Sequence, residues 1–343
     1  MNERVAASNP AEPVRPRRLA PGDLVAVCTP SGPGAPLAPR RFERGLQYLR
    51  DQGFRLRVGS QAWEEGYAAG SARARAAEIN DMIRDSDVRA VVCAIGGYTT
   101  NGILPHLDWK ALADDPKVIV GYSDITALLL AAFARTGVIT FHGPTLMPEF
   151  AEYPSALVYT EEAFRAATGS ARAVGRLRPP AAWTEEFLLW DERDGEPRRT
   201  RPHDGWQWLV GGTATGRLLG GNLDTVCALT GTGDLPDFTG AVFFWETCSQ
   251  SIGEIERNLT HLACAGVTDG IAAMIVGRSF RAGDAFEAQL RAYVSERWSG
   301  APFPVLAGVD LGHSDPMLTL PVGARCRLDS GTDVFEVIEA AVQ

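Results

Sequence analysis

The sequence predicts an α/β fold in which a parallel sheet carries helices on both faces. Short apolar runs alternate with segments of helical character along the first half of the chain. Glycine or serine follows several of these runs, at the carboxyl ends of strands, where such sheets bind ligands. A length of 343 residues and a hydrophobic content of 45% are enough for a large core and for two domains.

The first half shows the alternation most clearly. Short apolar runs, many rich in β-branched side chains, predict strands at residues 23–29, 54–58, 88–95, 118–123 and 138–141. Apolar residues at helical spacing, or filling a longer run, predict helices at residues 39–52, 71–86, 127–134 and 161–167. Ser31, Gly96, Gly97 and Ser123 fall at the strand ends, so we expect a site there.

The composition changes after residue 168, and a second domain is expected beyond it. Residues 170–203 are rich in proline, arginine, acidic residues and tryptophan with little periodicity, which is typical of a linker or lid. Further strands are expected at 241–245, 271–276, 305–309 and 324–328, and helices at 252–265 and 285–298. The expected organisation is a mobile tail at 1–18, an α/β domain at 19–168, a linker with a lid at 169–210 and a smaller domain at 211–343.

Composition and charge exclude several classes of partner. A net charge of −9 and a pI near 5.2 argue against nucleic acid or an anionic membrane, because either selects a basic face. No run reaches the ~18 apolar residues of a membrane helix, and the N-terminus lacks the apolar segment of a secretory signal, so we expect a cytoplasmic protein. No cluster has metal-ligand spacing, so neither a metal nor another cofactor is expected.

The cysteines do not form a disulfide framework. None belongs to a C-x-x-C pair, and most stand in apolar surroundings, which is typical of reduced, buried thiols. They are Cys28, Cys93, Cys227, Cys248, Cys264 and Cys326.

Ser123 stands where an apolar strand runs directly into a helix. A hydroxyl at such a turn can be a nucleophile, because the first N–H groups of the helix point outward and can bind an oxyanion. The pattern G-Y-S-D-I resembles the nucleophile elbow of α/β-hydrolases in part, since the second glycine is missing. Asp124 can equally be a plain helix cap, and Ser123 a turn residue.

A nucleophilic serine needs a base, and the base needs an acid that orients it. His313 stands just past the apolar strand 304–309, in a glycine-bearing loop from which it could reach a neighbouring domain. Glu246 directly follows the strand 241–245. We therefore expect a candidate triad of Ser123, Glu246 and His313. The alternatives are that Glu246 only caps the end of its strand and that His313 is an ordinary turn residue. The remaining histidines stand where structural roles are commoner: His106, His142, His203 and His261.

These positions belong to a set of motifs that resembles the LD-carboxypeptidase family of serine peptidases. The motifs are L-x-P-G-D-x-V-x-V from Leu19, Gly96-Gly97, G-Y-S-D-I-T, G-G-N-L, the strand ending in Trp245-Glu246, and G-x-D-x-G-H. The resemblance implies Ser123 as nucleophile, Glu246 as acid, His313 as base, and backbone N–H groups of Gly97 and Asp124 as the oxyanion hole. It also implies a flavodoxin-like N-terminal domain, a β-rich C-terminal domain and a homodimer.

Within this family, the chain is most similar to the microcin C self-immunity peptidases. Residues 96–105 resemble their G-G-x-N-S-N-x-L-L-P pattern, although Thr99 and Thr100 replace the asparagine and serine. The resemblance implies cleavage of the bond between an amino acid or peptide and a nucleotide. It also implies that Trp183 or Trp190 of the insert stacks on the nucleobase, the alternative being that these tryptophans only pin the insert to the body. The substrate-binding candidates are Gly96, Tyr98, Thr99, Thr100, Asn101, Trp183, Trp190 and Asn222.

Two alternatives stay open at this point. One is a murein tetrapeptide LD-carboxypeptidase, which would use the same triad with a different pocket. The other is a peptide- or nucleotide-binding protein without catalysis on a hydrolase scaffold.

Overall fold

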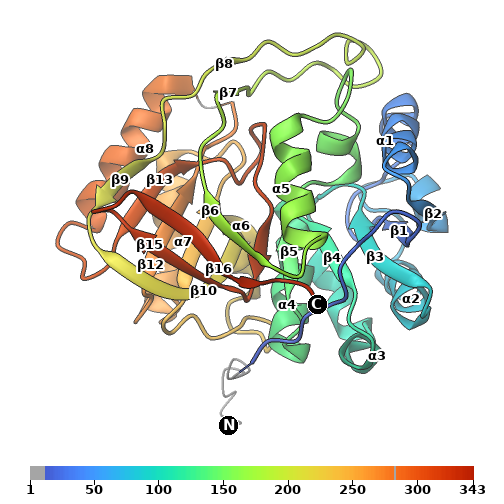
Figure 1. Ribbon diagram of the computed structural model, residues 1–343, viewed down its shortest axis with the longest axis horizontal. Coiled ribbons are helices and arrows are strands. Elements are labelled where there is room, and N and C mark those ends of the chain that lie inside the picture. The colour runs from blue at the N-terminus through green and yellow to red at the C-terminus, as the bar shows by residue number, and fades with distance from the viewer. Residues whose placement is uncertain (1–11, 282) are drawn as a thin grey trace.

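The N-terminal sheet has the flavodoxin-like strand order, as expected. A computed structural model describes residues 12–281 and 283–343 (Figure 1). The strands lie in the order β2-β1-β3-β4-β5 and are all parallel, with β14 added antiparallel at the β5 edge. They are β1 (Leu24–Cys28), β2 (Arg55–Val58), β3 (Val88–Cys93), β4 (Val118–Gly121), β5 (Thr140–His142) and β14 (Leu320–Val322).

Helices connect and cover these strands. They are α1 (Pro39–Asp51), α2 (Ala72–Arg84), α3 (Trp109–Asp114), α4 (Thr126–Thr136) and α5 (Val158–Thr168). The buried side chains of α1 include Phe42, Leu46 and Leu49, because these residues recur at helical spacing on one face. The α/β fold and its parallel N-terminal sheet are thus confirmed.

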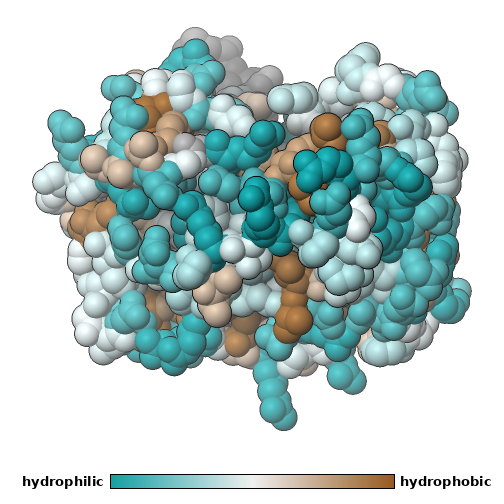
Figure 2. Space-filling model, turned by 90° about the horizontal axis from the view of Figure 1, so that it is seen from above, coloured by the Kyte–Doolittle hydropathy of each residue, from teal (hydrophilic) through white to brown (hydrophobic). Residues whose placement is uncertain are grey.

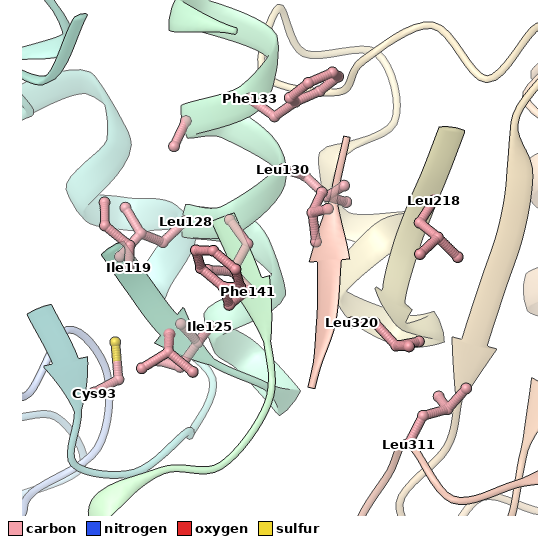
Figure 3. Packing of buried hydrophobic residues seen from close by; sticks show 14 of the residues in the cluster. Cys93, Ile119, Ile125, Leu128, Leu130, Phe133, Phe141, Leu218, Leu311 and Leu320 are labelled. Carbon is pink, nitrogen blue, oxygen red and sulfur yellow. The ribbon is translucent and has the colours of Figure 1, made fainter. Parts of the chain in front are cut away.

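Helix α4 is apolar on all sides because it packs against both halves of the molecule. Its residues from Thr126 to Phe133 are all buried. Figure 3 shows Leu128 of α4 on the same side as Ile119 of β4, and Leu130 on the opposite side of the helix, towards β14. A helix without a polar face must be surrounded by protein, so α4 joins the two sheets in one continuous core.

The second sheet has parallel strands in its centre and antiparallel strands at its edges. Its order is β6-β16-β15-β10-β11-β12-β13-β9, with β10 to β13 parallel. The strands are β6 (Ala173–Leu177), β9 (Gln207–Val210), β10 (Thr213–Asn222), β11 (Val242–Glu246), β12 (Ala273–Gly277), β13 (Val305–Val309), β15 (Arg325–Asp329) and β16 (Val334–Ala340). Its helices are α6 (Leu223–Leu229), α7 (Ile252–Cys264) and α8 (Gly283–Arg297).

The segment 169–210 is more regular than its composition indicated. Strands β6 and β9 from this segment pair with β16 and β13 at the two edges of the second sheet. Between them, β7 (Ala182–Trp183) and β8 (Arg201–Pro202) form a two-stranded ribbon. The loop that joins β7 to β8 runs along the top of Figure 1. We call residues 184–200 the insert loop.

The chain's surface is largely polar on the face that carries the insert loop. Seen from above, hydrophilic side chains cover most of this face, and small hydrophobic patches lie among them (Figure 2). Two cysteines correct the expectation of buried thiols, because Cys248 and Cys264 are exposed, whereas Cys28, Cys93 and Cys326 are buried. Among the residues that the structure describes, no helix is both long and apolar enough to cross a membrane.

The predicted tail falls partly outside this description. Residues 1–11 are not among those described, so only the end of the expected segment 1–18 can be placed. There, Val14 forms a parallel bridge with Val138, and the N–H of Arg18 donates to the carbonyl of Gln343.

Candidate active site

Ser123 sits on a strained turn between β4 and α4. Its φ of 61° lies in the left-handed region, which side chains other than glycine rarely adopt. Such a conformation costs free energy and is kept where the surrounding structure demands it, typically at functional sites. Gly96 faces this turn, and a Cβ atom added there would lie 2.9 Å from Ser123 Oγ. The loop after β3 can therefore approach the hydroxyl only because residue 96 has no side chain.

The side chains of Ser123, His313 and Glu246 form one hydrogen-bonded chain. His313 Nε2 lies 3.0 Å from Ser123 Oγ, and His313 Nδ1 lies 2.7 Å from Glu246 Oε2. An ionised carboxylate only accepts, so Nδ1 carries the proton and Nε2 is free to accept from the serine. Glu246 ends β11 and is fully buried, while His313 lies in the loop after β13. The three residues come together from two sheets.

Asn222 fixes the other oxygen of Glu246. Its Nδ2 donates to Glu246 Oε1 at 3.0 Å, while its Oδ1 accepts from the N–H and Oγ1 of Thr225 at the start of α6. Asn222 was expected to bind substrate. In the structure it is buried, caps α6 and holds the carboxylate of Glu246, so a contact between Asn222 and substrate stays a prediction.

The ion pair sets the charges of the two partners. Burial alone would raise the pKa of Glu246, but the charge of His313 and its hydrogen bond lower it overall. Burial alone would lower the pKa of His313, but Glu246 raises it well above the usual value. Glu246 is therefore ionised, and His313 gains affinity for a proton, as a general base requires.

Two backbone N–H groups beside Ser123 have no partner among the described residues. They belong to Gly97 and Asp124. Gly97 has a φ of 151°, and a Cβ atom there would lie 2.4 Å from the Oγ of Ser31. The N–H of Asp124 is adjacent to Ser123 in the chain, and the N–H of Gly97 lies in the facing loop after β3. An oxyanion hole needs two such N–H groups beside the nucleophile.

The carboxylate of Asp124 ties these loops together. Its Oδ2 accepts from Ser31 Oγ at 2.5 Å and from the N–H of Thr100 at 2.8 Å. The N–H of Thr99 in turn donates to Ser31 Oγ at 3.1 Å. The loops after β1, β3 and β4 are thus joined at one buried carboxylate, a role for Ser31 that the sequence did not indicate.

Ser123 and His313 open onto a cavity of about 410 Å³. Three of the predicted substrate-binding residues line it, namely Gly96, Tyr98 and Trp190. Trp190 belongs to the insert loop and is partly buried, with the guanidinium of Arg41 4.8 Å from its ring centroid. An aromatic ring at the wall of a cavity offers a surface on which a flat ligand can stack.

The surroundings of Trp183 favour the second of its two expected roles, which is to pin the insert to the body. It is only 2% exposed, and it does not line the cavity. The guanidinium carbons of Arg201 and Arg278 lie 4.0 and 3.9 Å from its ring centroid, so its faces are already covered. Trp183 therefore anchors the insert loop to the body instead of stacking on a ligand.

Thr99, Thr100 and Asn101 also lie outside the lining of the cavity. Thr100 is fully buried, and Thr99 accepts a hydrogen bond from Arg75 through its Oγ1 at 3.0 Å. Asn101 is exposed. These residues support the loop that carries Gly96, Gly97 and Tyr98, and their direct contact with a substrate stays a prediction.

Several cavity residues were not anticipated. Tyr122, Glu149, Arg198 and Asp315 all line it. The only available signals were weak, because Tyr122 belongs to the G-Y-S-D motif and Asp315 lies two residues after His313, whereas Glu149 and Arg198 stand in segments without a pattern. Within the described residues, no group of three or more histidine, cysteine or acidic side chains is placed to hold a metal ion.

Ion pairs hold the insert loop over this cavity. Asp191 accepts from the N–H groups of Arg40 and Arg41 at the start of α1. Arg198 Nη2 lies 2.7 Å from Glu152 and 2.8 Å from Asp315. The loop is thereby fastened both to the N-terminal domain and to the loop that carries His313.

The comparison with known proteins agrees with this architecture. The chain matches the LD-carboxypeptidase N-terminal domain over residues 25–143 and the LD-carboxypeptidase C-terminal domain over residues 215–328. It therefore belongs to the LD-carboxypeptidase family, which supports a serine carboxypeptidase-type hydrolase.

Individual relatives are similar over nearly the whole chain. A putative carboxypeptidase of Vibrio cholerae is 36% identical over 325 residues, which cover 94% of this chain and 96% of that protein. The microcin C7 self-immunity protein MccF of Escherichia coli is 34% identical over 334 residues, covering 96% and 97%. A solved structure of MccF in complex with aspartyl sulfamoyl adenosine matches with a TM-score of 0.88 at 32% identity, covering 96% and 100%. The predicted family resemblance is confirmed.

Proposed function

We propose that this protein is a serine amidase that hydrolyses the bond between an aminoacyl or peptidyl group and a nucleotide moiety. The hydrogen-bonded chain of Ser123, His313 and Glu246 at the cavity wall is the observation that carries this proposal. The relative MccF has been solved with aspartyl sulfamoyl adenosine and with glutamyl sulfamoyl guanosine. Both ligands join an amino acid to a nucleoside.

The geometry supports acyl transfer to the serine. Ser123 Oγ attacks the carbonyl carbon while His313 Nε2 takes the hydroxyl proton, and Glu246 stabilises the imidazolium that forms. The N–H groups of Gly97 and Asp124 receive the oxyanion of the tetrahedral intermediate. His313 then gives the proton to the leaving nitrogen, and a water molecule hydrolyses the acyl-enzyme with the same base.

Trp190 supports the nucleotide part of the proposal. It is one of the two tryptophans considered for stacking, and it lines the cavity that Ser123 faces. Stacking of a base on an aromatic side chain contributes about 1–3 kcal/mol. A nucleobase on Trp190 would direct the acyl end of such a substrate towards the serine.

The test compares two substrates on the purified protein. Aspartyl sulfamoyl adenosine should be hydrolysed to aspartate and the nucleoside sulfamate, as followed by liquid chromatography and mass spectrometry. A murein tetrapeptide is the competing substrate. Release of D-alanine from it, with the adenosine compound left intact, would contradict the proposal in favour of a murein carboxypeptidase. Binding of either compound without turnover would instead indicate a binding protein.

A further inference from the structure

Glu149 is a buried carboxyl group in the cavity wall without a cationic partner. It is 3% exposed, and its Oε1 accepts from the Tyr122 hydroxyl at 2.8 Å. Its Oε2 accepts from the N–H and Oγ1 of Thr145, at 2.7 and 3.2 Å. All of these donors are neutral. Within the described part of the chain, Glu149 takes part in no ion pair.

The cations of the same wall are already engaged. Arg198 pairs with Glu152 and Asp315, and Arg41 lies 3.1 Å from Asp194. Asp315 therefore has its counter-charge, whereas Glu149 has none. Burial raises the pKa of Glu149 to about 8, and the negative charge of Asp315 adds to the shift. A cation in the cavity would offset both the burial of the Glu149 carboxylate and its repulsion by Asp315.

Glu149 also lies near the reacting end of the cavity. The ring of Tyr122, whose hydroxyl binds Glu149, packs edge-on against His313 with the ring centroids 4.9 Å apart. Tyr122 directly precedes Ser123, and Ser123, Tyr122 and Glu149 line one cavity. An acyl group attached to Ser123 would therefore have its nearest substituents beside this wall.

We propose that Glu149, with Asp315 beside it, forms a subsite for an ammonium group on the acyl part of the substrate. This inference rests on the proposed function and narrows it. The enzyme would take aminoacyl groups that carry a free ammonium in preference to N-acylated ones. The ammonium would be the counter-charge that the buried carboxyl lacks, and a charged hydrogen bond in such surroundings is strong.

Binding to the Ser123→Ala protein tests this subsite without hydrolysis. Aspartyl sulfamoyl adenosine and its N-acetyl derivative are titrated separately at pH 7 by calorimetry. The N-acetyl compound should bind about 10- to 150-fold more weakly, the range expected for loss of a hydrogen bond to a charged group. Binding of the free amine should also release about one proton, because a carboxyl with a pKa near 8 is mostly protonated at pH 7.

A second pair of variants separates charge from structure. Adding Glu149→Gln to Ser123→Ala should abolish the preference, so that the two ligands bind within about twofold of each other and no proton is released. Glu78→Gln is the control, because Glu78 is a partly buried carboxyl whose pKa is also raised and which lines a different pocket. This control should leave the preference unchanged.

The outcomes distinguish this inference from the proposed function. Equal binding of the two ligands to Ser123→Ala, or a preference that survives in Glu149→Gln, would overturn the subsite even if the wild-type protein hydrolyses the compound. A preference for the free amine, together with no hydrolysis by the wild type, would support the subsite and contradict the function. Absence of binding by both ligands would contradict both. The comparison of ligands and the proton release need no change at Glu149, so they hold even if that variant does not fold.

Discussion

Replacing Glu246 by glutamine should disable His313 through the orientation of one amide. Asn222 presents its Nδ2 to Glu246, because its Oδ1 is held by the N–H and Oγ1 of Thr225. A glutamine at position 246 should therefore turn its oxygen towards Asn222 and its NH2 group towards His313. His313 Nδ1 must then accept, which moves the ring proton to Nε2. In that tautomer Nε2 cannot accept the proton of Ser123.

The expected loss follows from this change of tautomer. In serine proteases, the corresponding change from acid to amide lowers kcat about 10⁴-fold, which is equivalent to about 5.5 kcal/mol. Loss of the carboxylate charge also lowers the pKa of His313, which Glu246 raises in the wild type. Because the base must be neutral, kcat/KM of the wild type should rise with pH through a pKa above 6.5, and this limb should move to lower pH in Glu246→Gln.

The assay is hydrolysis of aspartyl sulfamoyl adenosine between pH 5 and pH 9, with a rescue variant. In Glu246→Gln/Asn222→Ala, the amide is free to turn its oxygen towards His313 Nδ1, so activity should recover in part relative to Glu246→Gln. Asn222→Ala alone removes the cap of α6 and should cost about 1 kcal/mol of stability. A double variant no more active than Glu246→Gln, or a single variant within about tenfold of the wild type, would refute the reasoning.

Two further predictions concern the cavity and the loops around it. Trp190→Ala should raise KM for the adenosine substrate about 5- to 150-fold, which corresponds to the loss of one stacking contact. Trp183→Ala should instead lower the melting temperature and leave KM of the folded protein unchanged. Steady-state kinetics and calorimetry would show the opposite pattern if the nucleobase stacked on Trp183. Asp124→Ala removes the acceptor shared by Ser31 and Thr100, so kcat should fall about 10²-fold or more as the oxyanion hole loosens. Unchanged kcat in a correctly folded Asp124→Ala protein would exclude that role.

Much of the fold follows from local sequence pattern. Strands β1 and β4 are continuous apolar runs, because a parallel sheet buried on both faces leaves no polar side to alternate. Short strands at sheet edges were less visible. Strand β14 has three residues, and it pairs with β5 from nearly 180 positions away in the chain, a long-range contact that no local pattern encodes.

The candidate site was predictable where chemistry demands a residue type at a strand end. Ser123 lies just after β4, Glu246 is the last residue of β11, and the scarcity of histidines left His313 as the candidate base. The roles of Trp183 and Asn222 could not be predicted in the same way. Whether a tryptophan faces a cavity or lies between two arginines depends on which side of the insert loop packs on the body, and sequence spacing does not determine that. The role of Glu149 could not be predicted either, because its segment carries no motif and its contact with Tyr122 depends on the tertiary fold.

The most direct test of the central claim is to identify the residue that carries the acyl group. The wild-type protein is mixed with aspartyl sulfamoyl adenosine, quenched in acid within milliseconds to seconds, and analysed by intact and peptide mass spectrometry. We predict an aspartyl adduct on the peptide that contains Ser123, and neither adduct nor product with Ser123→Ala. An adduct on another residue, or turnover by Ser123→Ala at the rate of the wild type, would contradict the account.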